Sequence, residues 1–157
     1  MHSLVKKLAP AVAAVITMAG AVTVAGTSSA SAAGWGCSGS EVSGSPYPTR
    51  TPSGAVFSYV HLYWDGSTGR NCAVNVKTGS LYGTPSLTEV SLSECAAGDT
   101  PGGNCEQIAA DGDNNIYSYY AGPVSVPAAG HCIVLEAWTL DASRANEADL
   151  FIGPFHC

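Results

Sequence analysis

The chain has 157 residues, is 46% hydrophobic and only 11% charged, and carries a formal net charge of −6. All twelve acidic residues lie beyond residue 33, with only four of the six basic ones, so residues 34–157 have a formal charge of −8. This balance repels a phosphate backbone, which argues against nucleic acid and favours cations or a basic protein surface as partners.

Residues 1–33 are predicted to be a signal peptide. Lys6 and Lys7 lie near its start, an Ala/Val-rich apolar run follows, and a tract of small residues ends at Ala33. This tract offers an A-x-A type cleavage site, with cutting expected after Ala32 or Ala33. A membrane anchor is the alternative, but a proline, a glycine and many alanines make the run weakly apolar for a bilayer span of about 20 residues. We therefore expect a secreted, extracellular protein.

Cysteines are the second sign of export. All six follow the predicted signal peptide: Cys37, Cys72, Cys95, Cys105, Cys132 and Cys157. An even number in an exported chain indicates three disulfides. Because there is no C-x-x-C pair and no cysteine is left over, neither a metal site nor a reactive thiol is expected.

Residues 34–54 are predicted to form an extended, accessible segment, because three prolines lie among glycines and serines. An edge strand with a loose linker is the alternative for this segment. Residues 55–157 are predicted to be one disulfide-bonded β domain, long enough to bury a modest core.

The first clear strand covers residues 55–64, where two kinds of side chain alternate. One side is mainly aliphatic and is expected to face the core. The other side is a candidate binding face, expected to be at least partly exposed: Phe57, Tyr59, His61 and Tyr63.

A turn over residues 65–69 leads to a second strand, so the two are predicted to form a hairpin. Further strands are expected near residues 87–95, 116–120, 124–126 and 132–138, with turns at 111–115 and 127–130 and a single helical turn within 141–149. Six to eight short antiparallel strands at this spacing indicate an all-β sandwich or barrel.

The stretch SYYAGPVSV contains two adjacent tyrosines, Tyr119 and Tyr120, ahead of a Gly-Pro break. Within a strand, neighbouring side chains point to opposite faces, so only one of these rings is expected to lie on the surface. Gly122-Pro123 is expected at a strand end, a bulge or a change of sheet.

No catalytic machinery is evident, and the protein is not expected to be an enzyme or to need a cofactor. The G-x-S-x-G motif of the serine hydrolases is absent. His61, His131 and His156 lie in or beside strands or cysteines, and the sequence does not measure how far apart carboxylates such as Glu89 and Glu136 lie.

A calcium loop is a second candidate site. Asp111, Asp113 and Asn115 have the 1, 3, 5 spacing of calcium ligands, but Ile116 replaces the expected glycine and Gly122 replaces the bidentate glutamate. A polar β-turn between strands explains the same residues, and the sequence does not decide between the two.

Three segments together resemble a known family: residues 62–77, with LYW and GRNCAVNVK; residues 119–124, YYAGPV; and residues 129–132, AGHC. They are similar to the small secreted actinobacterial proteins called spore-associated protein A-like. The resemblance covers roughly residues 55–132. It implies a disulfide-bonded β domain at the cell or spore exterior, and it carries over no catalytic residue.

The predicted disulfides are Cys72–Cys132, Cys95–Cys105 and Cys37–Cys157. The first pair joins two cysteines that are each in phase with the valines of a strand, the second closes a short Gly/Pro loop, and the third is what remains. Six cysteines allow 15 pairings.

The predicted function is that of a non-enzymatic, secreted surface or spore-associated structural or interaction protein. The alternative is a small secreted binding module or adaptor, in which the aromatic strand face or the N-terminal segment docks a carbohydrate or protein partner in a larger extracellular assembly. Solvent exposure of the aromatic face would help to distinguish the two.

Overall fold

The computed structural model describes residues 34–157. The predicted signal peptide and its cleavage site lie outside the described residues. Two short 3-10 turns, η1 (Gly34–Gly36) and η2 (Gly79–Leu81), accompany the strands. The strands are β1 (Ser40–Glu41), β2 (Tyr47–Arg50), β3 (Val56–Asp65), β4 (Arg70–Lys77), β5 (Ser86–Cys95), β6 (Gln107–Tyr117), β7 (Tyr120–Pro127), β8 (Ile133–Leu140) and β9 (Glu147–Phe155).

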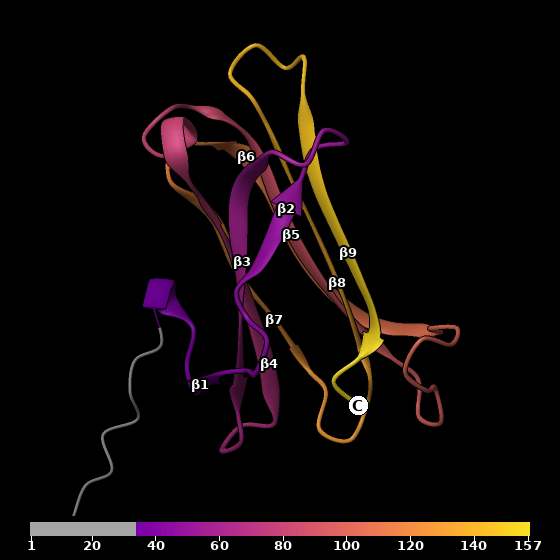
Figure 1. Ribbon diagram of the computed structural model, residues 1–157. Helices are drawn as coiled ribbons and strands as arrows, with labels where there is room; N and C mark the ends of the chain where they lie inside the picture. The colour runs from indigo at the N-terminus through magenta and orange to yellow at the C-terminus, as the bar shows by residue number, and fades with distance from the viewer. Residues whose placement is uncertain (1–33) are drawn as a thin grey trace, which may run out of the picture.

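The strands form one antiparallel sheet in the order β6-β5-β8-β9-β2-β3-β4-β7, with β1 paired to β3. The sheet curls into a nearly closed barrel, so the predicted all-β fold is confirmed (Figure 1). No helix in residues 34–157 is long and apolar enough to cross a membrane.

The core lies inside this barrel and is built from alternate residues of the strands. On β3, Val60 and Leu62 are fully buried, as predicted for its aliphatic side. They pack with aliphatic side chains from β5, β7 and β8, such as Leu92, Val124 and Leu135. This alternation places the other residues of β3 on the outer face of the barrel.

Buried polar groups link opposite walls of the barrel. The Asn75 side-chain amide on β4 donates to the Glu89 carbonyl on β5 at 2.8 Å. Lys77, 2% exposed, donates through Nζ to Ser86 Oγ at 2.6 Å and to the Tyr117 carbonyl at 2.9 Å, and also to the Thr84 carbonyl. Burial lowers the pKa of the Lys77 amine, and the three acceptors account for its three donors.

Most of residues 34–54 are exposed, but they are not separate from the β domain, which corrects the predicted boundary. They contribute β1 and β2, and β2 lies between β3 and β9 in the sheet. Thr49 is fully buried, and its hydroxyl bonds that of Ser58 at 2.7 Å. The β domain therefore includes this segment, and Ala55 is not its boundary.

The prediction for residues 111–115 is also wrong, and the reason lies in how the two end strands of the sheet, β6 and β7, meet. Residues 111–115 were predicted to form a turn but lie in the middle of β6, opposite β5. Within the described residues no backbone ladder joins β6 to β7. Instead, the Asp113 carboxylate accepts the Gly122 N–H at 2.7 Å and the Asp111 carboxylate accepts the Ser125 N–H at 2.8 Å. Acidic side chains therefore take the place of carbonyl acceptors and close the barrel.

Only one of the three predicted disulfides, Cys95–Cys105, is correct. The Cys72–Cys132 and Cys37–Cys157 predictions are wrong, since the structure joins Cys37 to Cys72 and Cys132 to Cys157. Cys72 points outward from β4 with the valines of its phase, because the core is formed by the other phase. The antiparallel pairing of β8 with β9 sets Ile133 opposite Phe155, and this brings Cys132 beside the chain end.

The predicted helical turn within residues 141–149 is a β-hairpin connection, and β9 begins at Glu147. Asp141 organises this connection by accepting hydrogen bonds from Asn146 Nδ2 at 2.6 Å, Ser143 Oγ at 2.8 Å and the Ala145 N–H at 3.0 Å. These bonds, that from Asn146 above all, lower the pKa of Asp141 from 3.8 to about 2.

The lowered pKa of Asp141 leads to a testable acid dependence. A carboxylate whose pKa is lower in the folded state stabilises the fold above its unfolded pKa of 3.8, and this contribution disappears as the pH falls to about 2. Asp141→Asn is therefore expected to lower Tm at about pH 5, with the difference from the wild type shrinking at about pH 2. Melting curves measured across this range test it, and a constant difference would contradict it.

Candidate functional site

The four side chains of the predicted aromatic face of β3 differ in how far they are exposed to solvent. Tyr59 is 37% exposed, Phe57 and His61 are half-buried, and Tyr63 is only 5% exposed. Tyr63 packs with Cys37, Cys72, Val74 and Val76 in a small cluster on the outside of the sheet. The outer face of β3 and β4 is therefore partly a second apolar layer.

The cover is an N-terminal strap, residues 34–39, which crosses the outer face of β3 and β4. The Cys37–Cys72 disulfide ties the strap to β4. Its Trp35 ring lies 4.5 Å from the His61 ring, centroid to centroid. Next to the strap, the Glu41 carboxylate lies 2.7 Å from His61 Nδ1. Half of the predicted binding face is thus occupied by this chain's own N-terminus.

The aromatic residues that stay exposed come from distant parts of the sequence. Val76 on β4 lies opposite Tyr59 on β3 and also opposite Tyr120 on β7, so the two tyrosines flank it on the outer face. Tyr120 is 38% exposed. Only the pairing of β4 with both strands brings these rings together, so the sequence contains no direct signal for the pair.

Tyr119 and Tyr120 are both on the surface, which corrects the prediction that only one would be. Tyr119 is outside β7, in the two-residue link from β6, so strand alternation does not apply to it. It is 51% exposed and packs against Tyr82, 57% exposed, with ring centroids 5.0 Å apart. We call the five exposed rings the aromatic surface: Trp35, Tyr59, Tyr82, Tyr119 and Tyr120.

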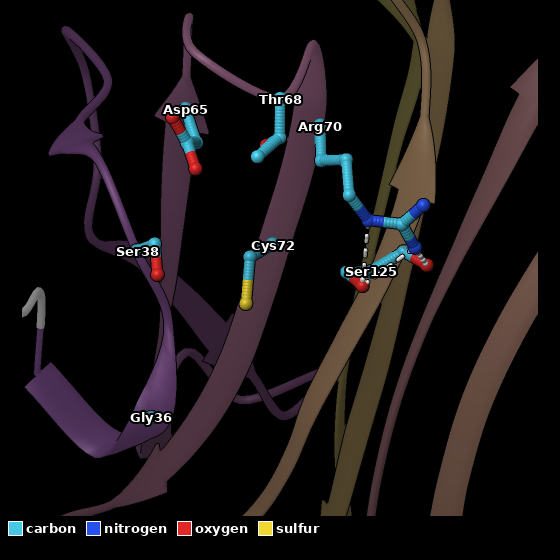
Figure 2. Close-up of a pocket in the computed structure, with 7 residues that line it drawn as sticks. All are labelled: Gly36, Ser38, Asp65, Thr68, Arg70, Cys72 and Ser125. Carbon is cyan, nitrogen blue, oxygen red and sulfur yellow. Dashed lines mark hydrogen bonds between the residues drawn. The ribbon is translucent and has the colours of Figure 1, made fainter.

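A hollow of ≈ 190 Å³ lies beside the strap, between the β3–β4 turn and β7 (Figure 2). Asp65 and Arg70 are opposite each other in the hairpin, but Arg70 turns to β7, where Nη2 donates to the Ser125 carbonyl at 2.7 Å and to its hydroxyl at 2.8 Å. Asp65 accepts the hydroxyl and N–H of Ser67, and the hydroxyl bond is the main cause of its lowered pKa. Asp65 and Arg70 therefore each bond to groups of the protein itself, Asp65 within the β3–β4 turn and Arg70 across to β7.

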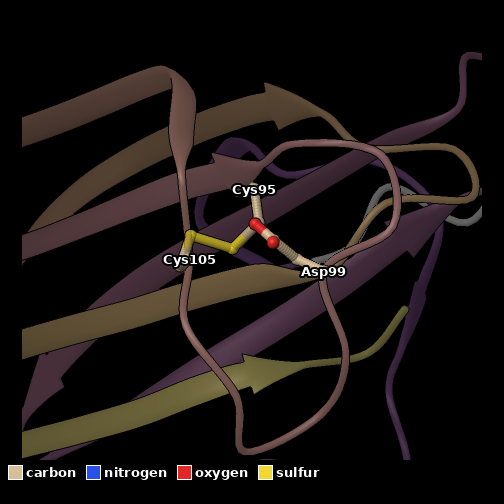
Figure 3. A group of neighbouring side chains, drawn as sticks. All are labelled: Cys95, Asp99 and Cys105. Carbon is tan, nitrogen blue, oxygen red and sulfur yellow. A yellow bond between two sulfur atoms is a disulfide. The ribbon is translucent and has the colours of Figure 1, made fainter.

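A cluster with the composition of a metal site lies at the Cys95–Cys105 disulfide. The Asp99 carboxylate and the two sulfurs all lie within 4.8 Å of one another (Figure 3). The sulfurs are bonded to each other and are not thiolates, so they are poor metal ligands. The Asp99 carboxylate accepts the Glu106 N–H at 2.8 Å. This bond gives Asp99 a structural role in the loop that the disulfide closes.

The other candidate residues are not gathered in one place. His131 Nδ1 lies 2.7 Å from Glu94, whereas His156 follows β9 next to the C-terminal cysteine. Glu89 on β5 accepts the side-chain amide of Asn114 at 3.0 Å. The calcium candidates Asp111 and Asp113 lie along β6 and bond to β7, so the ligand loop that their spacing suggested is not formed.

Comparison with known proteins places the chain in a family. No protein-family model matches it, and no solved structure matches it. The chain is 30% identical over 163 residues to spore-associated protein A of Streptomyces coelicolor (strain ATCC BAA-471 / A3(2) / M145), an alignment that covers 91% of this chain and 97% of that protein. The alignment extends well beyond the residues that carried the resemblance. The chain belongs to the spore-associated protein A-like family.

Proposed function

We propose that the protein is exported and acts outside the cell, at the cell or spore surface, as a non-enzymatic structural or interaction protein. The observation that carries the proposal is the similarity, over 91% of the chain, to a protein named for its association with spores. Three disulfides in a domain of this size support export, since such bonds persist in oxidising surroundings.

Fractionation of the organism that encodes the protein tests this function. An antibody raised against residues 34–157 is expected to detect the protein on intact spores or on the cell surface. Protease added from outside under reducing conditions should abolish the antibody staining. Intact mass should show a mature chain that starts at Ala33 or Gly34. Retention of the full chain in the cytosol would contradict the proposal.

A second candidate function is that of a small extracellular binding module. The aromatic surface favours it, because exposed aromatic rings gathered from separate parts of the chain are typical of interaction sites. The N-terminal segment supports an adaptor role less well than the sequence suggested, because β1 and β2 are bonded into the sheet.

A further inference from the structure

The aromatic surface has the composition of a site for an uncharged ligand. Its five rings carry uncharged hydroxyl and indole N–H groups, and beside Trp35 the Glu41 carboxylate is paired with His61 at 2.7 Å. The nearest cation on β4, Lys77, is 2% exposed and points inward to Ser86 and Tyr117. Arg50 on β2 is an exposed cation opposite Val56, but its Nη1 donates to the Gly54 carbonyl at 3.3 Å, and the formal charge of −8 on residues 34–157 disfavours a carboxylate or phosphate ligand.

The spacing of the rings suits an extended chain better than a single small molecule. Tyr59 and Tyr120 are two strands apart, and antiparallel neighbours are 4.7–4.9 Å apart, so their backbones are separated by about 10 Å. An extended β-linked glycan presents similar faces on alternate rings at a comparable interval. Aromatic rings offer flat apolar faces for the C–H groups of a sugar, with polar tips for its hydroxyls.

A hollow of ≈ 290 Å³ continues the surface at the β6–β7 link. It is lined by Tyr117, Ser118, Tyr119, Tyr120 and Gly122. Its size is close to the lower limit of about 300 Å³ for small-molecule sites, which suits one sugar ring. A chain lying across Tyr59 and Tyr120 would therefore have a place for a further ring beside Tyr119.

The structure also holds this surface in place before any ligand binds. The Lys77 N–H donates to the Tyr119 carbonyl at 2.9 Å, and the Gly83 N–H donates to the Ser118 carbonyl at 2.8 Å. At the other end, the Cys37–Cys72 disulfide anchors the strap that carries Trp35. A preorganised surface loses less conformational entropy on binding.

We propose that the aromatic surface binds a neutral, extended polysaccharide chain. The inference rests on the proposed function, because an exported surface protein meets such polymers outside the cell. Tyr59 and Tyr120 provide the stacking faces, and the hollow at the β6–β7 link receives an adjoining sugar ring.

Binding assays with residues 34–157 test the proposal. The probes are cellohexaose and chitohexaose by calorimetry, and insoluble cellulose and chitin by sedimentation, with polygalacturonate as the anionic comparison. Saturable binding is expected to at least one neutral glycan and not to polygalacturonate. Tyr59→Ala and Tyr120→Ala are each expected to weaken that binding about tenfold or more, whereas Tyr59→Phe should largely keep it.

Phe151→Ala is the matched control. Phe151 is 65% exposed on β9 and is not part of the aromatic surface, so its loss should leave glycan binding unchanged. Failure of every neutral glycan to bind at millimolar concentration, or equal loss in the Phe151 variant, would overturn the proposal. If the wild type is found on spores without binding glycans, the proposed function stands and the glycan inference fails. Loss of spore association in the two tyrosine variants without glycan binding would identify a protein as the occupant instead.

Discussion

A chain that begins at Ala55, with Cys72 changed to Ser to avoid a free thiol, is expected not to fold. It lacks β2, which lies between β3 and β9, so the barrel would lose one strand from within the sheet. It also lacks Val42, an 8% exposed member of the main core cluster. Ser58 loses its buried bond to the Thr49 hydroxyl.

The expected loss is comparable to the whole stability of a domain. The Cys37–Cys72 disulfide joins residues 35 apart and contributes about 4 kcal/mol in the loop-entropy model. Burial of Val42 adds about 1.5–3 kcal/mol. The Ser58 N–H loses its acceptor, the Thr49 hydroxyl at 3.1 Å, and an unsatisfied buried donor costs about 1–3 kcal/mol. Domains of this size are stable by only about 5–15 kcal/mol.

Circular dichroism and heteronuclear NMR test this expectation. The shortened chain should show no cooperative melting and poor dispersion of amide signals. The matched control is residues 34–157 with Cys37→Ser and Cys72→Ser, which keeps β1 and β2 and should fold with a lower Tm. A cooperative, β-rich chain starting at Ala55 would show that the N-terminal strands are dispensable.

Leu62→Ala is expected to lower the free energy of unfolding by about 2–5 kcal/mol, because the residue is fully buried and a cavity would remain. Leu62 lies opposite Ala73 on β4, and so small a neighbour has little side chain with which to fill the space. Tyr59→Ala, on the opposite face of the same strand, is expected to cost about 1 kcal/mol or less, the range of a cross-strand pair.

Denaturant unfolding of both variants measures the difference. The predicted outcome is a large drop in the midpoint for Leu62→Ala and a small one for Tyr59→Ala, with unchanged slopes. Similar losses in the two variants would mean that the outer face of β3 is a second core and not a surface available for binding.

Local patterns predicted several elements well, because they depend on neighbours in the chain. Alternation gave the inner and outer faces of β3, and the turn after Asp65 gave its hairpin with β4. Cys95–Cys105 was predictable because its cysteines are only ten positions apart in the chain. The two wrong disulfides were not, since each depends on which strands pair and on which face of β4 is covered.

Two segments that were wrongly predicted, one as a turn and one as a helical turn, also show that local patterns do not determine long-range pairing. Residues 111–115 are rich in Asp, Asn and Gly, as turns are, but β6 tolerates them because it is exposed and its carboxylates bond to β7. Residues 141–146 have helix-tolerant composition but form a hairpin link. Recognising that link would have aligned β8 with β9 and placed Cys132 beside Cys157.

By itself, the sequence determined the all-β class, the even set of cysteines and the family, because composition, period-two alternation and short motifs are local properties. Only the tertiary structure decided how the N-terminal strap covers Tyr63 and His61, and which rings stay exposed. Tyr59 and Tyr120 are 61 positions apart in the chain and meet only because β4 pairs with both β3 and β7. Such a surface is the product of long-range strand pairing, which no local pattern encodes.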